Sequence, residues 1–386
     1  MLLLKNAKIF PVSNEPFIGD VAIDGKKIVA IGKNLDYTGA DVFDLTGCCI
    51  TPGFVDAHCH IGMIEDAIGF EGTDVNECSD PLTPALRAID AINPFDRCFK
   101  DAMKAGVTTV LTGPGSANVI GGTFVALKLS GGTVEDMILK EPIAMKAAFG
   151  ENPKGVYADQ KKSPMTRMAI ASILRKALFD TKQYIEKKEK AEKDKLFELN
   201  FALEPLIPVL KGEIPLKIHC HRADDILTAI RIANEFGIKY TLDHCTEGYL
   251  IPDEIKAALK GNLIGIIIGP LLSDRSKVEL KNLTFEAPRI LYENGIDFAM
   301  MTDSPVIPEQ YLSVCASIAV KEGLPEDIAL KCITLNAAKV IGLDSRLGSI
   351  EPGKDADIAV FSGHPLDVRS RCKMTIIDGK MVHYEP

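Results

Sequence analysis

The sequence predicts an α/β protein, in which a (β/α)₈ TIM barrel is joined to a small, discontinuous β-sandwich domain formed by both termini. The central part of the chain alternates apolar, strand-like runs with helical stretches, and both ends read as short strands with turns. The length of 386 residues is too great for one small core. We therefore expect the β-sandwich domain at residues 1–52 and 346–386 and the barrel at residues 53–345.

Eight apolar runs are the expected barrel strands. Near-continuous apolar strands separated by helices are typical of a parallel sheet that is covered on both faces. A count of eight favours a closed barrel, in which functional groups lie at the C-terminal ends of the strands. An open, doubly wound sheet is the alternative, but no glycine-rich phosphate motif follows the first run. The runs are residues 49–60, 107–113, 123–129 (which also reads as a helix), 143–149, 216–221, 240–244, 263–269 and 298–302.

The two ends of the chain share a β-rich texture. Residues 3–10 are one expected strand, and residues 19–32 are an expected hairpin that turns at Asp24-Gly25. Near the C-terminus, residues 355–361 and 374–382 are expected strands, the second of which turns at Asp378-Gly379. Because these ends enclose an α/β centre, we expect them to meet in one small domain.

Composition and charge limit the classes of partner. The chain is 46% hydrophobic and 25% charged, as in ordinary globular proteins. A net charge of -9 argues against nucleic acid, which favours an excess of Lys and Arg. No run is long enough for a membrane span, the N-terminal apolar stretch is too short for a signal peptide, and the ten cysteines lack a disulfide framework. We expect a cytoplasmic homo-oligomer that acts on a small molecule.

Five of the seven histidines lie at the ends of apolar runs. Residues two apart in a strand point to the same side, so each His-Cys-His directs two imidazoles to one face. A single histidine of this kind is usually a core residue with one hydrogen bond, but three clusters in matching contexts favour a metal site. Asp303 directly follows the last run, and we expect it to face the same mouth of the barrel. The histidines are His58, His60, His219, His221 and His244.

These residues belong to a larger, ordered set that resembles the amidohydrolase superfamily. The narrower resemblance is to the imidazolonepropionase-like and Xaa-Pro dipeptidase-like metal-dependent hydrolases. The matching segments span nearly the whole chain in the expected order, and the set is far more specific than a single His-x-His. The segments are residues 52–60, 106–110, 217–219, 243–244, 302–303, 336–339 and 348–360.

The resemblance implies a hydrolase that attacks a C–N bond of an amide, peptide-like or cyclic amide substrate. It implies a divalent metal that activates water, with catalytic roles for Asp303 as proton shuttle and for His244. Zn is the first choice, in one or two ions, with Mn, Fe or Co as alternatives. A metal lowers the pKa of bound water from about 15.7 to about 7, which supplies a nucleophile at neutral pH. Heterocycle deamination on the same barrel and a non-catalytic assembly protein are the rival hypotheses.

Two ligand assignments stay open. Members with two metals often bridge them with a carboxylated lysine or a glutamate, and here Lys146 and Glu151 are the candidates. A buried lysine in mid-strand is costly unless it is modified or paired, which keeps Lys146 a candidate for a carboxylated ligand. Glu151 lies at the strand end, where the mouth is expected, and is the favoured candidate. His219 and His221 differ in depth by about 6.6 Å. The resemblance favours His219 as the ligand and leaves His221 nearer the rim, for substrate.

Substrate contacts are nominated from position alone. Arg222, Arg167 and Tyr157 lie in segments expected at the mouth, where an arginine can bind a carboxylate through two hydrogen bonds. A structural ion pair or hydrogen bond is the more common role for each of them. The charged run at residues 184–195 is either a lid over the pocket or a solvated helix, and the second is the usual meaning of such a run.

Overall fold

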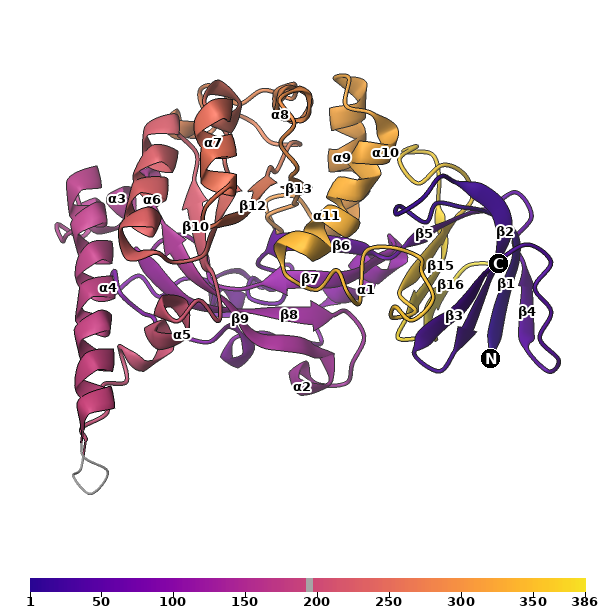
Figure 1. Ribbon diagram of the computed structural model, residues 1–386, viewed down its shortest axis with the longest axis horizontal. Helices are drawn as coiled ribbons and strands as arrows, with labels where there is room; N and C mark the ends of the chain where they lie inside the picture. Colours follow the sequence, from indigo (N-terminus) through magenta and orange to yellow (C-terminus); the bar gives the residue numbers. More distant parts are fainter. Residues whose placement is uncertain (192–196) are drawn as a thin grey trace.

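Two β-sheets organise the protein, one in a barrel and one in a small domain beside it (Figure 1). The computed structural model describes residues 1–191 and 197–386. The eight-stranded sheet of the barrel curls until its first and last strands approach each other, where the backbone N–H of His60 donates to the carbonyl of Ser304 at 2.8 Å. The predicted α/β barrel with a separate small β domain is therefore confirmed.

Each of the eight predicted runs contributes a strand to the barrel. The strands follow one another in the sheet in chain order. One prediction needs correction: β8 runs antiparallel to both of its neighbours, so the barrel is not eight parallel β/α units. The bounds are β6 (Phe54–Cys59), β7 (Val107–Thr112), β8 (Ile120–Lys128), β9 (Ile138–Ala148), β10 (Leu216–Cys220), β11 (Tyr240–His244), β12 (Leu263–Ile268) and β13 (Ala299–Met300).

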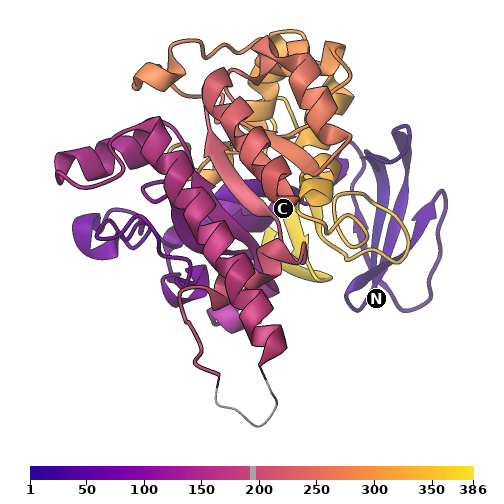
Figure 2. The same ribbon diagram turned by 60° about the vertical axis from the view of Figure 1, so that its left-hand side comes forward.

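Helices surround the barrel and follow most of the parallel strands (Figures 1 and 2). Helix α6 is typical, because Ile226, Ala229 and Ile232 are buried at helical spacing and Gly237 ends it with a left-handed φ of 65°. The helices are α1 (Arg97–Lys104), α2 (Val134–Met137), α3 (Glu151–Asp159), α4 (Arg167–Lys190), α5 (Ile207–Leu210), α6 (Ala223–Phe236), α7 (Pro252–Leu259), α8 (Ala287–Glu293), α9 (Leu312–Lys321), α10 (Glu326–Cys332) and α11 (Leu335–Val340), with short 3₁₀ helices between them.

Helix α4 carries most of the predicted charged run. It lies along the outside of the barrel and extends beyond it (Figure 2). Its inner residues, such as Ile170 and Leu174, are buried, whereas the charged residues 186–190 at its end are exposed. This placement agrees with a solvated helix rather than a lid. Residues 192–195 of the run lie outside the described residues.

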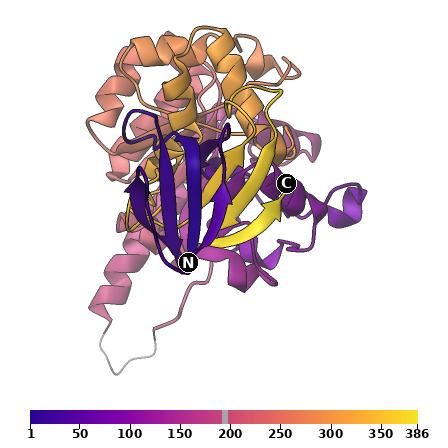
Figure 3. The ribbon, with the colours of Figure 1, turned by 90° about the vertical axis from the view of Figure 1, so that its right-hand side faces the viewer.

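The small domain is one continuous sheet that both termini build (Figure 3). Strands β5 and β14 pair antiparallel, which joins the two ends of the chain. Side chains from β2 and from β15, near opposite ends of the sheet, share one apolar core, so the sheet curls over on itself. The strands are β1 (Leu2–Ile9), β2 (Phe17–Asp24), β3 (Lys27–Gly32), β4 (Asp41–Asp44), β5 (Cys49–Pro52), β14 (Ile358–Phe361), β15 (Cys372–Ile377) and β16 (Lys380–Tyr384).

The first barrel strand continues directly from this sheet, since only Gly53 separates β5 from β6. A buried ion-pair cluster also joins the two parts, as Lys128 of β8 contacts Asp355, Asp357 and Asp378. The domain limits at residues 52 and 345 stay predictions. Among the described residues, no helix combines the length and the apolar character that crossing a bilayer requires.

Candidate metal centre

The predicted metal ligands meet at one end of the barrel. His58 and His219 lie near the ends of β6 and β10, and His244 ends β11, so their side chains gather at the C-terminal ends of parallel strands. The rings are close, with centroids 4.3 Å apart for His219 and His244 and 5.5 Å apart for His58 and His244. His60, His221 and Asp303 join them around a cavity of about 260 Å³.

Four of the five imidazoles are oriented by a hydrogen bond from Nδ1. This arrangement leaves each Nε2 directed toward the shared centre, as outer partners do for metal-ligating histidines. The Nε2 atoms of His58 and His221 are buried without a hydrogen-bond partner in the described part of the chain. The Nδ1 acceptors are Asp243 Oδ2 for His58 (2.8 Å), the Gly113 carbonyl for His60 (2.7 Å), Thr246 Oγ1 for His221 (2.7 Å) and the Gly269 carbonyl for His244 (2.9 Å).

The distances between these groups fit a bound cation better than direct hydrogen bonds. Asp303 Oδ1 lies 3.4 Å from His58 Nε2 and 3.3 Å from His60 Nε2. A hydrogen bond between such atoms measures about 2.7–3.2 Å. Two ligands about 2.1 Å from one tetrahedral ion lie about 3.4 Å apart. Imidazole nitrogens with a carboxylate oxygen are a donor set for zinc and similar divalent metals, so the residues present fit such an ion.

Charge states also suit metal binding. Burial lowers the pKa of His58 and of His221 to about 4, and it lowers the pKa of His244 as well, so these rings are neutral at pH 7. Burial alone would raise the pKa of Asp303, but the neighbouring His244, His58 and His60 hold that pKa well below its usual range. The site therefore presents neutral imidazoles and one ionised carboxylate.

A left-handed backbone brings two of the residues into place. His244 and Asp303, each just at or after a strand end, have φ values of 65° and 55°. Residues other than glycine rarely adopt this conformation, which concentrates at functional sites. Adjacent residues of a strand normally point to opposite sides. Because the backbone turns at His244, the His244 ring reaches the centre even though the side chain of Asp243 also points into the barrel.

Asp243 lies in one of the matching sequence segments, but no role was predicted for it. Its Oδ2 accepts from His58 Nδ1 and lies 3.1 Å from Lys217 Nζ, which also donates to the Ala57 carbonyl at 2.9 Å. Burial acts to raise the pKa of Asp243, but Lys217 and His58 lower it well below the usual range. The signal in the sequence was the carboxylate directly before His244. Asp243 therefore holds the His58 ring in position, and Lys217 in turn pairs with Asp243.

We expect Asp243→Asn to weaken metal binding by about 10–100-fold, the usual scale for outer partners of metal ligands. Asparagine keeps the shape and one acceptor but removes the negative charge that faces Lys217 and His58. Competition with a chromophoric zinc chelator measures the change. Asp297→Asn, an exposed carboxylate at the far end of the barrel, is the matched control. An unchanged zinc affinity in Asp243→Asn contradicts this role.

The two candidate bridging residues have different surroundings. Lys146 is fully buried in β9, beside Lys217 in the neighbouring strand, and its Nζ has no hydrogen-bond partner within the described residues. Burial lowers the pKa of Lys146 to about 8. Glu151 begins α3, and its Oε2 accepts from the backbone N–H of Glu279 at 3.1 Å. Glu151 belongs to neither group of His, Asp and Glu side chains close enough to share an ion.

The three residues that were nominated for substrate contact are paired with other side chains of the protein. Arg222 pairs with Asp224 and Arg167 pairs with Asp225, both at 2.9 Å, and the Tyr157 hydroxyl donates to Asn118 at 2.9 Å. They are absent from the described lining of the histidine cavity, which does include His221. A substrate role for these three stays a prediction that the geometry does not support. The lining instead contains Asn76, Ser116, Asn152, Ser273, Ser276 and Lys277.

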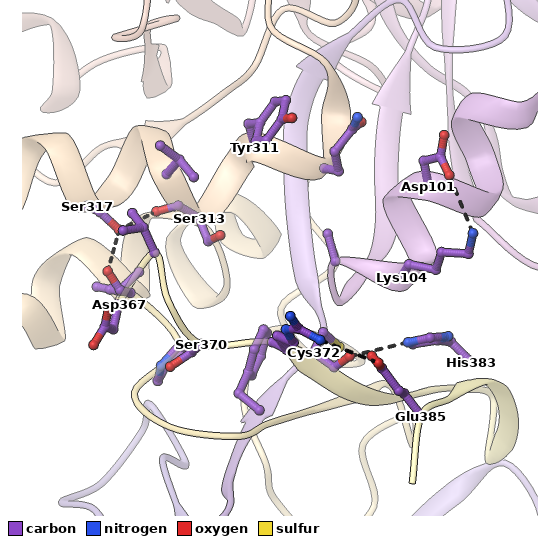
Figure 4. Close-up of a pocket in the computed structure, with 18 residues that line it drawn as sticks. Asp101, Lys104, Tyr311, Ser313, Ser317, Asp367, Ser370, Cys372, His383 and Glu385 are labelled. Atoms are coloured by element: carbon purple, nitrogen blue, oxygen red, sulfur yellow. Dashed lines mark hydrogen bonds and ion pairs between the residues drawn. The ribbon is translucent and has the colours of Figure 1, made fainter.

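A second cavity, of about 440 Å³, lies away from the histidine cluster (Figure 4). It lies between α1, the start of α9 and the last residues of the chain. Here His383 Nε2 donates to the Cys372 carbonyl at 3.3 Å, and Lys104 pairs with Asp101 at 3.7 Å. None of the predicted metal ligands is among its described lining residues. The candidate functional site is therefore the histidine cavity.

Comparisons with known proteins show which family the chain belongs to. A crystal structure of an amidohydrolase from Thermotoga maritima MSB8 is 44% identical, covers 100% of both chains and superposes with a TM-score of 0.96. The chain belongs to the amidohydrolase family. The model of that family, "Amidohydrolase family", matches residues 209–382. A Xaa-Pro dipeptidase structure shares the fold at 18% identity, with a TM-score of 0.58 over 99% of both chains.

Curated relatives of the chain carry the names of different enzymes. The amidohydrolase tasK of Hapsidospora irregularis is 28% identical over 96% of the chain, and an adenine deaminase of Bacillus velezensis is 25% identical over 98% of it. The chain spans only 40% and 57% of the lengths of these two relatives. Family membership supports a hydrolase and leaves the substrate to be determined.

Proposed function

We propose that the protein is a metal-dependent hydrolase that cleaves a C–N bond of an amide, peptide-like or cyclic amide substrate. The observation that carries this proposal is the convergence of buried imidazole nitrogens on Asp303 at ligand-to-ligand distances. His58, His60, His219, His244 and Asp303 would hold the ion. We propose Zn first, with Mn, Fe or Co as alternatives. A cytoplasmic location and a homo-oligomeric state stay predictions.

A divalent cation bound there supplies a Lewis acid and lowers the pKa of water to about 7. The chain's own residues then transfer protons and orient the imidazole rings. Asp303, ionised and at the mouth, accepts a proton from the attacking water and returns it to the leaving nitrogen. His244, held by the Gly269 carbonyl, lies beside Asp303 in the same group of potential ligands. Asp243 and Lys217 keep His58 from turning away.

The cavity lining indicates a small substrate with both polar and apolar parts. Asn152, Ser273 and Lys277 offer hydrogen bonds, whereas Val75 and Leu280 offer apolar contact. A volume of about 260 Å³ suits a compact molecule. His221 also lines this cavity, and its contact with substrate stays a prediction.

Heterocycle deamination is the second candidate, because an adenine deaminase is among the relatives. Both reactions attack a carbon bonded to nitrogen, so the site geometry alone does not favour deamination. Release of ammonia separates deamination from amide cleavage. A non-catalytic assembly protein is disfavoured, since the five clustered histidines and Asp303 are all present in the chain.

The test is metal removal followed by a substrate screen. Protein treated with a chelator and then reconstituted with Zn²⁺, Mn²⁺ or Co²⁺ is assayed against dipeptides, N-acyl amino acids, cyclic amides and aminopurines. We expect activity on one class that disappears in the metal-free protein and returns with metal. Protein that binds no divalent metal, and that has no activity after reconstitution, contradicts the proposal.

A further inference from the structure

Glu309 is a buried acidic side chain that no sequence motif singled out. It begins the 3₁₀ helix Glu309–Tyr311, just before α9, and is only 1% exposed. Its Oε2 lies 3.1 Å from the hydroxyl oxygen of Thr302, which is itself fully buried and directly precedes Asp303. Its Oε1 has no hydrogen-bond partner within the part of the chain that the structure describes. The Thr302 hydroxyl is therefore the group through which Glu309 meets its surroundings.

The Thr302 hydroxyl lies between two carboxyl groups. On the side away from Glu309, its Oγ1 lies 2.7 Å from Asp56 Oδ2, which also accepts from the Thr302 backbone N–H at 2.8 Å. The other oxygen of Asp56 accepts from the His58 backbone N–H at 2.9 Å. A threonine hydroxyl carries a single hydrogen, which serves only one of the two carboxyl groups at a time. Asp56 and Glu309 therefore compete for this hydrogen.

A proton on Glu309 removes this competition. As a carboxylic acid, Glu309 donates to Thr302 Oγ1, and Thr302 donates in turn to Asp56, so both contacts are hydrogen bonds. As a carboxylate, Glu309 would be a buried charge whose Oε1 lacks a donor, which is costly. Burial and the neighbouring Asp56 act in the same direction, because both raise the pKa of Glu309 well above its usual range. The surroundings therefore favour the neutral acid.

The same hydroxyl braces the backbone on both sides of Asp303. Thr302 precedes Asp303, and Ser304, which follows it, donates its backbone N–H to Thr302 Oγ1 at 3.1 Å. Asp303 has a left-handed φ of 55°, a conformation that persists only when surrounding contacts hold it. The Ser304 carbonyl also accepts from the His60 N–H at 2.8 Å, which ties this turn to the His-Cys-His segment. The direction of the Asp303 carboxylate therefore depends on a turn that Thr302 holds.

We propose that Glu309 is a positioning residue that acts as a neutral carboxylic acid and, through the Thr302 hydroxyl, holds the turn that directs Asp303 toward the histidine cavity. Its proton leaves the Thr302 hydrogen for Asp56. Glu309 is absent from the described lining of that cavity, so it acts on the reaction only through other residues. The inference rests on the proposed function, in which Asp303 transfers a proton, but the protonation of Glu309 can be measured without any activity.

Infrared spectroscopy tests the proton directly. A protonated carboxyl group absorbs at a higher frequency than a carboxylate, and the protein is measured in D₂O at neutral pH. We expect wild type to show such a band, part of which is lost in Glu309→Gln and none in Glu247→Gln. Glu247 is the matched control, because it is also buried but its two oxygens accept from Asn282 and from the Ala223 N–H. No band in wild type, or a band that Glu309→Gln leaves unchanged, overturns the inference.

Kinetics test the positioning role. Glutamine keeps the volume of Glu309 and offers an N–H donor to Thr302, whereas methionine keeps the volume and offers none. We expect kcat near the wild-type value in Glu309→Gln and at least about 10-fold lower in Glu309→Met, since misplacing a reacting group by about 1 Å can cost about 100-fold. KM and zinc content are expected to stay unchanged. Equal kcat in wild type and Glu309→Met, or an equal loss in both variants, overturns the inference.

Thr302→Val provides an independent variant on another element. If Glu309 acts through the Thr302 hydroxyl, adding Glu309→Met to Thr302→Val lowers kcat no further, whereas additive losses overturn this route. Circular dichroism and thermal melting verify that each variant is folded. Metal-reconstituted wild type without activity on any substrate class contradicts the proposed function. The infrared band then still decides whether Glu309 is protonated, so the two failures are distinguishable.

Discussion

Replacing Asp303 by asparagine is expected to lower turnover by a factor of about 10² to 10⁴ while the metal is largely retained, on the usual scale of general acid–base effects. The carboxylate is ionised because His244, His58 and His60 hold its pKa low, so it is in the charge state that a proton acceptor needs. Asparagine offers an oxygen at nearly the same place, but it neither accepts nor returns that proton.

The measurement is kcat on the substrate class found by the screen, together with zinc content of the same samples. Asp297→Asn again provides the control, because it makes the same chemical change on an exposed residue away from the cavity. Turnover near the wild-type value in Asp303→Asn, with metal present, removes Asp303 from the proton-transfer role. If the variant loses the metal together with turnover, the result would instead show that Asp303 acts chiefly as a metal ligand.

Replacing Lys128 by methionine is expected to lower the free energy of unfolding by about 3–5 kcal/mol, the scale for breaking a buried ion pair. Lys128 Nζ lies 2.7 Å from Asp355 and 3.2 Å from Asp357, and it also contacts Asp378. Only 7% of the lysine side chain is exposed. Methionine fills a similar volume but leaves three carboxylates without their shared cation.

Urea unfolding followed by circular dichroism measures this loss. Lys140→Met is the control, since Lys140 lies on the next strand, β9, and is exposed. If the lysine mainly joins the barrel to the small domain, the small domain should unfold first in Lys128→Met. Equal stability of the two variants would show that the cluster contributes little.

Much of the fold could be predicted because its strands carry local signals. Each apolar run ends in a polar residue or a turn, and the Asp24-Gly25 and Asp378-Gly379 hairpins are visible in the sequence. The direction of β8 could not be predicted. All nine of its residues are buried, so its apolar pattern suits a parallel or an antiparallel strand equally. Only pairing with β7 and β9 decides between them.

The nominated substrate residues illustrate another limit. Arg222 and Arg167 lie near the expected mouth in sequence, but both face acidic residues at the start of α6. A long, charged side chain can reach several partners, and which one it meets depends on how helices pack. Chain position therefore said little about which groups these arginines bind.

The sequence by itself determined the family, the barrel and the histidines that meet in it. Alternation along a strand is a local geometric rule, so His-Cys-His directed two imidazoles to one face before any tertiary contact was known. Only the tertiary structure decided which groups complete the site. The Asp243–Lys217 pair behind His58 and the approach of Asp303 to His58 and His60 both join segments far apart in the chain. Such contacts form between elements, and no local pattern encodes them.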